Sequence, residues 1–295
     1  MKGHRSYRYR VVDVFTKEPL EGNALAVFPD SSGIDDATMQ KIAKELHLAE
    51  TTFVASPTRA DCAARVRIFT PAREMPFAGH PTVGTSFVML DEGMVPKNSQ
   101  KFVLEEGVGP VPVRVETGDR PMIWLRTPPI EFGRCYRTSA CAEALGLDEG
   151  DLLEAVPQIV SAANPAVFVA LKDRSAVDRA WLDVRGLRTL QSESKESLFV
   201  FVFSLTSQGV YSRMFAPDHG VPEDPATGSA TGPLAAFMMN RGLVSNASGT
   251  RFVSEQGTKM GRRSFLHVLI NGENGSEGIE VGGHVTSVVE ATLTL

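Results

Sequence analysis

A segment that occurs twice constrains the fold of this chain more than any other feature. The first copy contains ETTFV and RIFTPAREMPFAGHPTVGT, and the second contains ESLFV and RMFAPDHGVPEDPATGSAT. Without a gap, and always 146 residues apart, the copies match at Glu50/Glu196, Phe53/Phe199, Val54/Val200, Arg67/Arg213, Phe69/Phe215, Pro71/Pro217 and Pro76/Pro222. Each copy then enters a Gly/Pro-rich turn and an apolar segment. The repeat predicts two similar halves with a pocket where they meet, facing the free N–H groups of two helix N-termini.

Length and patterning agree with two domains. The 295 residues are 42% hydrophobic and 22% charged, which is ordinary globular composition, and this length suits roughly two domains. The pattern breaks near residues 128–133. We therefore expect an N-terminal half made of residues 1–128 together with 284–295, and a C-terminal half made of residues 129–283.

Short alternating or apolar runs bounded by Gly and Pro predict strands in both halves. Residues 102–129 read as several such strands, with the GVG of residues 107–109 as a hairpin turn. An amphipathic helix begins at Asp35/Asp36, and two segments, residues 82–90 and 228–240, are apolar on every side, as buried helices are. The predicted fold class is α+β, with two pseudo-symmetric domains, each a largely antiparallel sheet or barrel wrapped around a central apolar helix.

Charge and motifs argue against several classes of function. The net charge is −5 and Lys and Arg are scattered, which argues against a nucleic-acid partner. No run approaches the ~20 apolar residues of a membrane helix, and the start lacks the apolar segment of a signal peptide. The three cysteines lack CxxC spacing and fit the reduced thiols of a cytoplasmic protein. Metal, nucleotide-phosphate and GxSxG motifs are missing too, so the expectation is acid–base chemistry with no metal and no cofactor.

The first repeat copy carries an acid and an imidazole. Glu50 lies between an amphipathic helix and a strand, where burial among apolar neighbours would raise its pKa and suit it to proton transfer. The alternative is a surface acid at a helix end. His80 stands between Gly79, which permits close backbone approach, and Pro81, which suits the first position of a helix. His80 could donate a hydrogen bond, move a proton, or be structural.

The second copy carries the sequence EDPATGS. Asp224 precedes a proline and is therefore expected to be extended. Thr227, Gly228 and Ser229 offer hydroxyls and free amides at a helix start, which suits the carboxylate or phosphate of a small ligand. Ordinary helix capping by the same side chains is the alternative interpretation.

These motifs, together with YRVVDVFTKEPLEGNALAVF, EQGTKMGR and VGGHV, resemble the phenazine-biosynthesis PhzF-like family, in order from about residue 7 to the C-terminus. The resemblance implies the diaminopimelate epimerase-like fold and a homodimer. It also implies a cofactor-independent isomerase of a small carboxylate substrate, similar to trans-2,3-dihydro-3-hydroxyanthranilate isomerase.

The resemblance also implies roles for individual residues. Glu50 matches the general acid/base that moves a proton from one ring carbon to another, and His80 and Asp224 match its assisting polar residues. The residues that match substrate contacts are Gly79, Gly228, Ser229 and, more weakly, Asn23.

Epimerases and racemases of this fold use paired cysteines at the two helix starts, where this chain has Gly79-His80 and Asp224-Pro225. A one-base proton shift is therefore expected. Two alternatives stay open: an amino-acid epimerase or racemase with Asp224 as second base, and a non-catalytic metabolite-binding protein of the same fold.

Overall fold

The computed structural model describes residues 5–191, 198–219, 221–271 and 278–295. Contacts between Cα atoms divide the chain into two compact units, residues 1–126 with 282–295, and residues 127–281. The sequence pattern placed these boundaries two residues later. Thr127 belongs with the second unit because its N–H donates to the carbonyl of Ile279. Glu196, the repeat partner of Glu50, lies outside the described residues.

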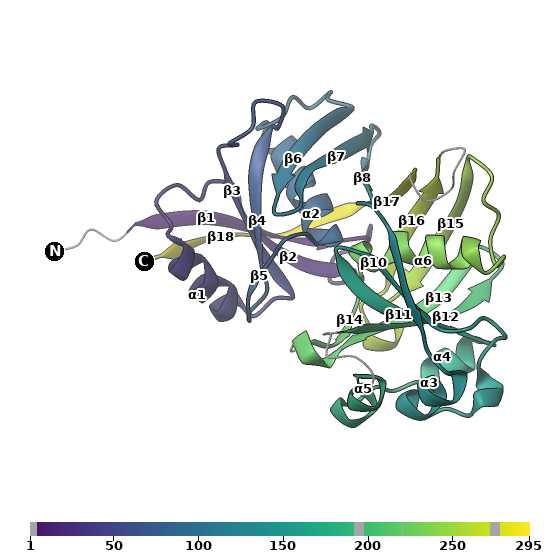
Figure 1. Ribbon diagram of the computed structural model, residues 1–295. Coiled ribbons are helices and arrows are strands. Elements are labelled where there is room, and N and C mark those ends of the chain that lie inside the picture. The colour runs from purple at the N-terminus through teal and green to yellow at the C-terminus, as the bar shows by residue number, and fades with distance from the viewer. Residues whose placement is uncertain (1–4, 192–197, 220, 272–277) are drawn as a thin grey trace. The chain divides into compact units, whose positions relative to one another are not determined.

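Unit 1 is a mixed sheet with two helices (Figure 1). Most neighbouring strands are antiparallel, but β2–β3 and β4–β6 are parallel, and each of these pairs is joined through a helix. The elements are β1 Ser6–Val14, β2 Asn23–Phe28, α1 Asp36–Leu46, β3 Glu50–Ala55, β4 Ala64–Phe69, β5 Glu74–Met75, α2 Gly79–Asp91, β6 Lys101–Glu106, β7 Gly109–Glu116, β8 Met122–Arg126 and β18 Val285–Thr294.

Unit 2 repeats this plan with extra helices (Figure 1). Its parallel pairs are β11–β12 and β13–β15. The elements are β9 Glu131–Cys135, α3 Thr138–Leu145, β10 Gln158–Ala162, β11 Asn164–Leu171, α4 Arg174–Arg179, α5 Val184–Gln191, β12 Phe199–Thr206, β13 Gly209–Ala216, β14 Val221–Asp224, α6 Gly228–Asn240, β15 Thr250–Gln256, β16 Ser264–Ile270 and β17 Ile279–Gly283, with 3₁₀ turns at Glu149–Asp151, Pro217–His219 and Thr258–Met260. The last two residues of β17 already belong to unit 1.

The two apolar helices are buried, as the sequence predicts. In α2 and α6 almost every residue is buried, because both helices are apolar on all sides. Helix α2 packs on β1, β2, β3, β8 and β18 of its own unit, and α6 packs on β10, β11 and β16 of its own. Helix α6 has the predicted bounds. Helix α2 begins three residues earlier than predicted.

That earlier start corrects the position of Pro81. The helix begins at Gly79 after Ala78, so Pro81 is its third residue rather than its first. A proline is tolerated there because the first turn has N–H groups with no acceptor inside the helix.

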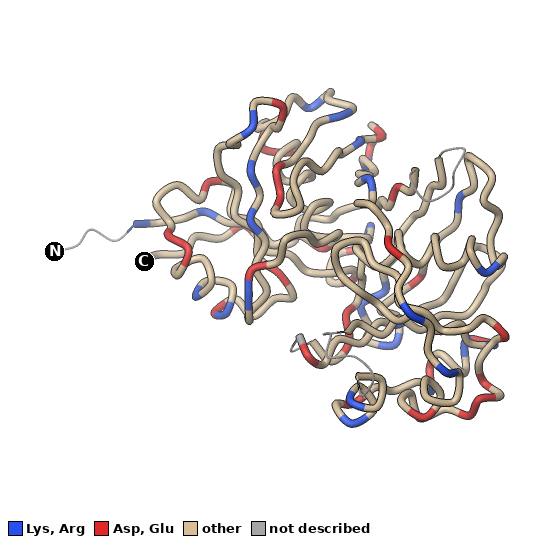
Figure 2. The backbone as a smooth tube through the Cα atoms, in the orientation of Figure 1, with Lys and Arg blue, Asp and Glu red and all other residues tan. Residues whose placement is uncertain are grey.

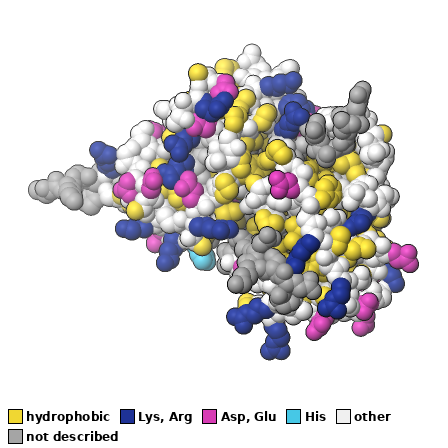
Figure 3. All heavy atoms as spheres, viewed as in Figure 1, with side chains coloured by type: hydrophobic (Ala, Val, Ile, Leu, Met, Phe, Trp, Pro, Cys, Tyr) yellow, Lys and Arg dark blue, Asp and Glu magenta, His cyan; other side chains and the backbone are white. Residues whose placement is uncertain are grey.

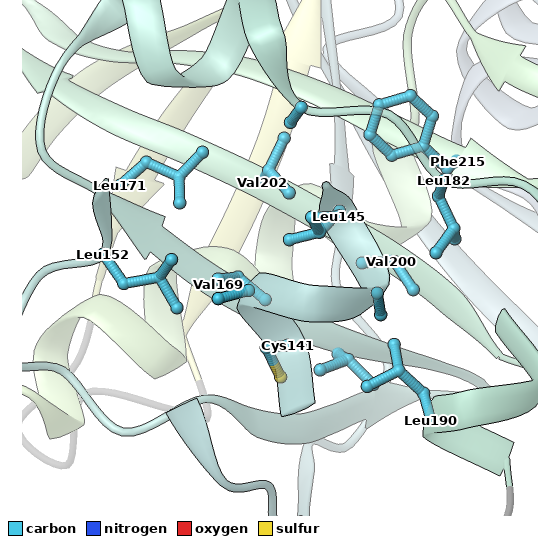
Figure 4. Close-up of a cluster of buried hydrophobic side chains, with 14 of the residues drawn as sticks. Cys141, Leu145, Leu152, Val169, Leu171, Leu182, Leu190, Val200, Val202 and Phe215 are labelled. Atoms are coloured by element: carbon cyan, nitrogen blue, oxygen red, sulfur yellow. The ribbon is translucent and has the colours of Figure 1, made fainter. Parts of the chain in front are cut away.

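Strand alternation gives the sheet of unit 2 two apolar faces. Phe168 of β11 faces α6, whereas its neighbours Val167 and Val169 face the other side. Figure 4 shows that second side, where Leu145 of α3 and Leu190 of α5 lie with the side chains of β11 and β12. The sequence pattern did not predict α5, nor the parallel pairs, but the α+β class with mostly antiparallel neighbours is confirmed.

Charged residues are mixed along both units. Figure 2 shows Lys and Arg interleaved with Asp and Glu, and the face seen in Figure 3 carries both signs among uncharged side chains. None of the helices in the described ranges is long and apolar enough to span a bilayer.

Candidate active site

Glu50 and His80 meet inside unit 1. Glu50 is the first residue of β3, and His80 is the second residue of α2. Glu50 Oε2 lies 3.1 Å from His80 Nε2, and the Glu50 side chain keeps 17% of its exposure. The ring N–H is not aligned on the carboxylate, since Nε2 has no hydrogen-bond partner among the described residues. Catalytic hydrogen bonds are often long or misaligned before substrate binds. The proximity therefore makes the pair a candidate for proton transfer.

Asn23 determines which nitrogen of the His80 imidazole carries the proton. The Asn23 side chain, buried at the start of β2, has its Nδ2 atom 3.2 Å from His80 Nδ1. An amide nitrogen only donates, so Nδ1 accepts and the ring proton sits on Nε2, the nitrogen that lies 3.1 Å from Glu50. Burial lowers the pKa of His80 to about 3, so the ring is neutral near pH 7. His80 is thus neutral, with its N–H on the nitrogen that lies close to Glu50, and the close approach is not an ion pair.

Without Asn23, the His80 ring should no longer be restricted to this tautomer. In Asn23→Leu, His80 Nδ1 loses its donor in a buried place, at a cost of about 1–3 kcal/mol in unfolding free energy. We expect ¹⁵N NMR of the ring to change from one neutral tautomer to a mixture. Asn98→Leu, at an exposed position of the same unit, is the control. A wild-type tautomer in Asn23→Leu would show that Asn23 does not orient the ring.

The start of α2 offers backbone donors beside His80. Ala78 is the N-cap residue, and it gives the helix no side-chain cap. The N–H groups of Gly79 and His80 come first in the helix and have no acceptor within it. Two N–H groups and the positive end of the helix dipole favour an anion at this point.

In unit 2, Asp224 forms a tight turn with Thr227. Asp224 ends β14 and is extended, as the following proline predicts, and it is 7% exposed. The Thr227 hydroxyl donates to Asp224 Oδ2 over 2.5 Å. Thr227 then precedes α6, whose first two residues are Gly228 and Ser229, both buried. The side chain of Thr227, the N-cap residue of α6, makes no capping hydrogen bond, so the capping alternative is wrong for Thr227.

Gln256 completes this turn and was not identified in the sequence. Its side chain, at the end of β15, is 0% exposed. Its Nε2 donates to the Asp224 carbonyl over 2.8 Å and to the Thr227 hydroxyl over 3.0 Å, and its Oε1 accepts from the Thr227 N–H over 3.2 Å. The amide therefore fixes both ends of the turn. The only signal was the EQG sequence, which gave no reason to choose a glutamine.

The structure thus gathers the candidate residues into two sets. Unit 1 holds Glu50, His80, Asn23 and Gly79, and unit 2 holds Asp224, Gly228 and Ser229. The predicted pocket that joins both sets stays a prediction. Within the described ranges, no group of three or more His, Cys, Asp or Glu side chains is arranged to hold a metal ion.

Comparison with known proteins gives consistent matches along the chain. The family model described as phenazine biosynthesis-like protein matches residues 12–291. The trans-2,3-dihydro-3-hydroxyanthranilate isomerase of Pseudomonas aeruginosa is 34% identical over 288 residues, covering 96% of this chain and 98% of that protein.

Solved structures agree with this match. A structure described as a predicted epimerase from Pseudomonas aeruginosa is 33% identical, with a TM-score of 0.83 over 97% of this chain and 99% of that one. A phenazine biosynthesis protein of the PhzF family from Bacillus anthracis has a TM-score of 0.88 over 99% of this chain and 100% of that one. Its 24% identity supports the fold alone.

Proposed function

Because this chain belongs to the phenazine biosynthesis-like family and is an isomerase like its relatives, we propose that it moves a proton within a small carboxylate substrate, with Glu50 as the single general acid/base. The observation that carries the proposal is the 3.1 Å approach of Glu50 to a neutral, buried imidazole. The proposed substrate is trans-2,3-dihydro-3-hydroxyanthranilate or a close analogue, by similarity to the relative of that name.

The proposed reaction balances without an external oxidant or reductant. Ionised Glu50 takes a proton from one ring carbon, and the electron pair of that C–H bond shifts the neighbouring double bond. Protonated Glu50 then returns the proton to a second carbon, where a new C–H bond forms. The residue ends in its starting state, as general acid–base catalysis requires.

His80 supports this cycle as a hydrogen-bond donor. The bond from Asn23 to Nδ1 keeps the ring proton on Nε2, the nitrogen that lies 3.1 Å from Glu50. A donor at this place stabilises the negative charge on Glu50 before the transfer. The low pKa of the ring means that His80 does not compete for the proton near pH 7, which favours Glu50 as the group that moves it.

Each helix start by itself offers suitable partners for a substrate carboxylate. The free N–H groups of Gly79 and His80 in unit 1, and of Gly228 and Ser229 in unit 2, are the donors that anions use at helix N-termini. Gln256 keeps Asp224 and Thr227 in one conformation next to the second of these.

The direct test is turnover of the proposed substrate. Purified protein incubated with trans-2,3-dihydro-3-hydroxyanthranilate should convert it to a double-bond isomer, followed by ¹H NMR. Inversion of a stereocentre with no shift of the double bond would favour the epimerase alternative, with Asp224 as second base. Binding without conversion would favour the metabolite-binding alternative. Either outcome would contradict the proposal.

A further inference from the structure

A second acid, Glu106, lies beneath the first turn of α2. It is the last residue of β6 and is 5% exposed. Its Oε1 lies 2.7 Å from the hydroxyl of Thr82, the fourth residue of α2. Its Oε2 has no hydrogen-bond partner among the described residues. A carboxylate in such a place would be largely unsatisfied.

The bonds of Thr82 indicate that Glu106 is protonated. The Thr82 hydroxyl also lies 2.8 Å from the carbonyl of Ala78, which can only accept. A hydroxyl has one proton, so Thr82 cannot donate to both oxygens. Both contacts are satisfied when Glu106 donates its own proton to Thr82, and Thr82 donates to Ala78. The chain of bonds then ends at the N-cap residue of α2, next to Gly79 and His80.

The internal repeat gives an independent argument. In unit 1, β4 pairs with β6 in parallel with Arg65 opposite Glu105, and in unit 2 β13 pairs with β15 with Tyr211 opposite Glu255. Arg65 and Tyr211 hold the 146-residue spacing of the repeat. The next residue along each second strand is Glu106 in unit 1 and Gln256 in unit 2.

The residues that follow agree with this equivalence. A Cβ atom on Gly107 would lie 2.7 Å from Pro76 Cα, and one on Gly257 would lie 3.0 Å from Pro225 Cα, so each glycine packs against the turn before the central helix. Gln256 is a neutral side chain that donates to its turn. Glu106 takes the same strand position and has a similar shape, and when protonated it too is a neutral donor, although its partner Thr82 lies in the first turn of α2 rather than before the helix.

We propose that Glu106 is a positioning residue of the Glu50–His80 site, and that it holds the first turn of α2 in place as a protonated carboxylic acid. An ionised Glu106 would need the Thr82 hydroxyl as its donor, so the hydroxyl would leave the Ala78 carbonyl, which would keep only the 3.3 Å bond from the Thr82 N–H. The first turn would loosen at Gly79 and His80, and the imidazole would move relative to Glu50. The role in catalysis rests on the proposed function, whereas the role in α2 does not.

The charges around Glu106 are compatible with this state. Burial raises the pKa of Glu106 to about 8, and a hydrogen bond donated by Thr82 to the ionised carboxylate would act in the opposite direction. Neighbouring Glu105 is turned to the surface, where it accepts from Thr58 and from the Arg59 N–H. Arg65 of β4 lies opposite Glu105 rather than Glu106, and His80 of α2 is neutral. Burial is therefore the dominant cause of the raised pKa of Glu106.

Stability against pH gives the first measurement. The folded pKa of about 8 lies above the ordinary value of 4.5, so the folded state holds the proton more tightly and stability falls as pH rises between these values. Relative to Glu106→Gln, the unfolding constant of the wild type should rise by up to about tenfold per pH unit from pH 5 to 8, and then level off. Exposed Glu18→Gln is the control and should follow the wild type.

The second measurement follows the position of the His80 ring rather than the stability of the protein. In the wild type, the ¹⁵N signals of the His80 ring should change with a midpoint near pH 8, together with the ¹³C signal of the Glu106 carboxyl. In Glu106→Gln the His80 signals should stay constant through this range. If the protein has isomerase activity, the alkaline limb of kcat should shift to higher pH in the same variant.

Three outcomes would overturn the proposal. They are a Glu106 carboxyl that titrates near its ordinary value, a His80 ring that does not follow it, and a Glu106→Gln variant whose His80 signals titrate as in the wild type. None of these three measurements needs a substrate. They therefore test the role of Glu106 even if the protein does not turn over the proposed substrate.

Discussion

Glu50→Gln is expected to lower turnover of the substrate by about 10²- to 10⁴-fold, the range that general acid–base catalysis contributes, because Glu50 is the only group assigned to carry the proton. Glutamine keeps the shape of the side chain and can still meet His80, but it cannot take a proton. KM should change little, since the proposed carboxylate contacts are at the helix starts. Circular dichroism and the unfolding transition should match those of the wild type.

Glu45→Gln is the matched control, since Glu45 is an exposed acid near the end of α1, five residues away in the same unit. It should keep wild-type kcat. A Glu50→Gln variant with more than about a hundredth of wild-type turnover would be incompatible with loss of the sole base, because even weak general acid–base catalysis contributes about 10².

Gln256→Leu is expected to lower the free energy of unfolding by about 2–4 kcal/mol, because buried polar groups that lose a partner cost about 1–3 kcal/mol each. The Thr227 N–H and the Asp224 carbonyl both lose the bonds that the amide makes. Leucine fills a similar volume, so the effect reports hydrogen bonding rather than a cavity. The turn before α6 should loosen at Asp224 and Gly228.

Urea unfolding measures this loss, and amide hydrogen exchange at Gly228 and Ser229 should be faster in the variant. Gln208→Leu, in an exposed turn of the same unit, is the control and should change stability by less than about 0.5 kcal/mol. If Gln256→Leu were as stable as the wild type, other groups would have replaced the amide as hydrogen-bond partners. Gln256 would then not be needed to hold Asp224 in place.

The sequence predicted the fold well because the repeat and the hydrophobic patterns are local signals. The bounds of α6 follow directly from an apolar run between a Gly-containing turn and Gly242, whose φ of 65° suits a residue just past a helix end. The parallel pairs could not be predicted in this way. Pairing between distant strands leaves no mark in the periodicity of either strand.

The candidate site was predicted only in part, because only some of its residues stand in distinctive local sequences. Glu50, His80 and Asp224 stand in unusual local sequences, and the first two do lie together. The hydrogen-bond partners of these residues are side chains on strands that are distant in the sequence. Asn23, Glu106 and Gln256 are ordinary polar residues in their own segments, and only tertiary structure shows which of them reach α2 or the turn before α6.

Solvent deuterium is the most direct test of one-base transfer by Glu50. We predict that wild-type protein in D₂O introduces deuterium at the product carbon that receives the proton, because the proton held by the partly exposed Glu50 can exchange with solvent before it is returned. NMR would show this as a reduced ¹H signal at that carbon. Glu45→Gln should do the same, and Glu50→Gln should leave the substrate unlabelled and unconverted over the same time. Label introduced by Glu50→Gln at a rate near that of the wild type would contradict the account.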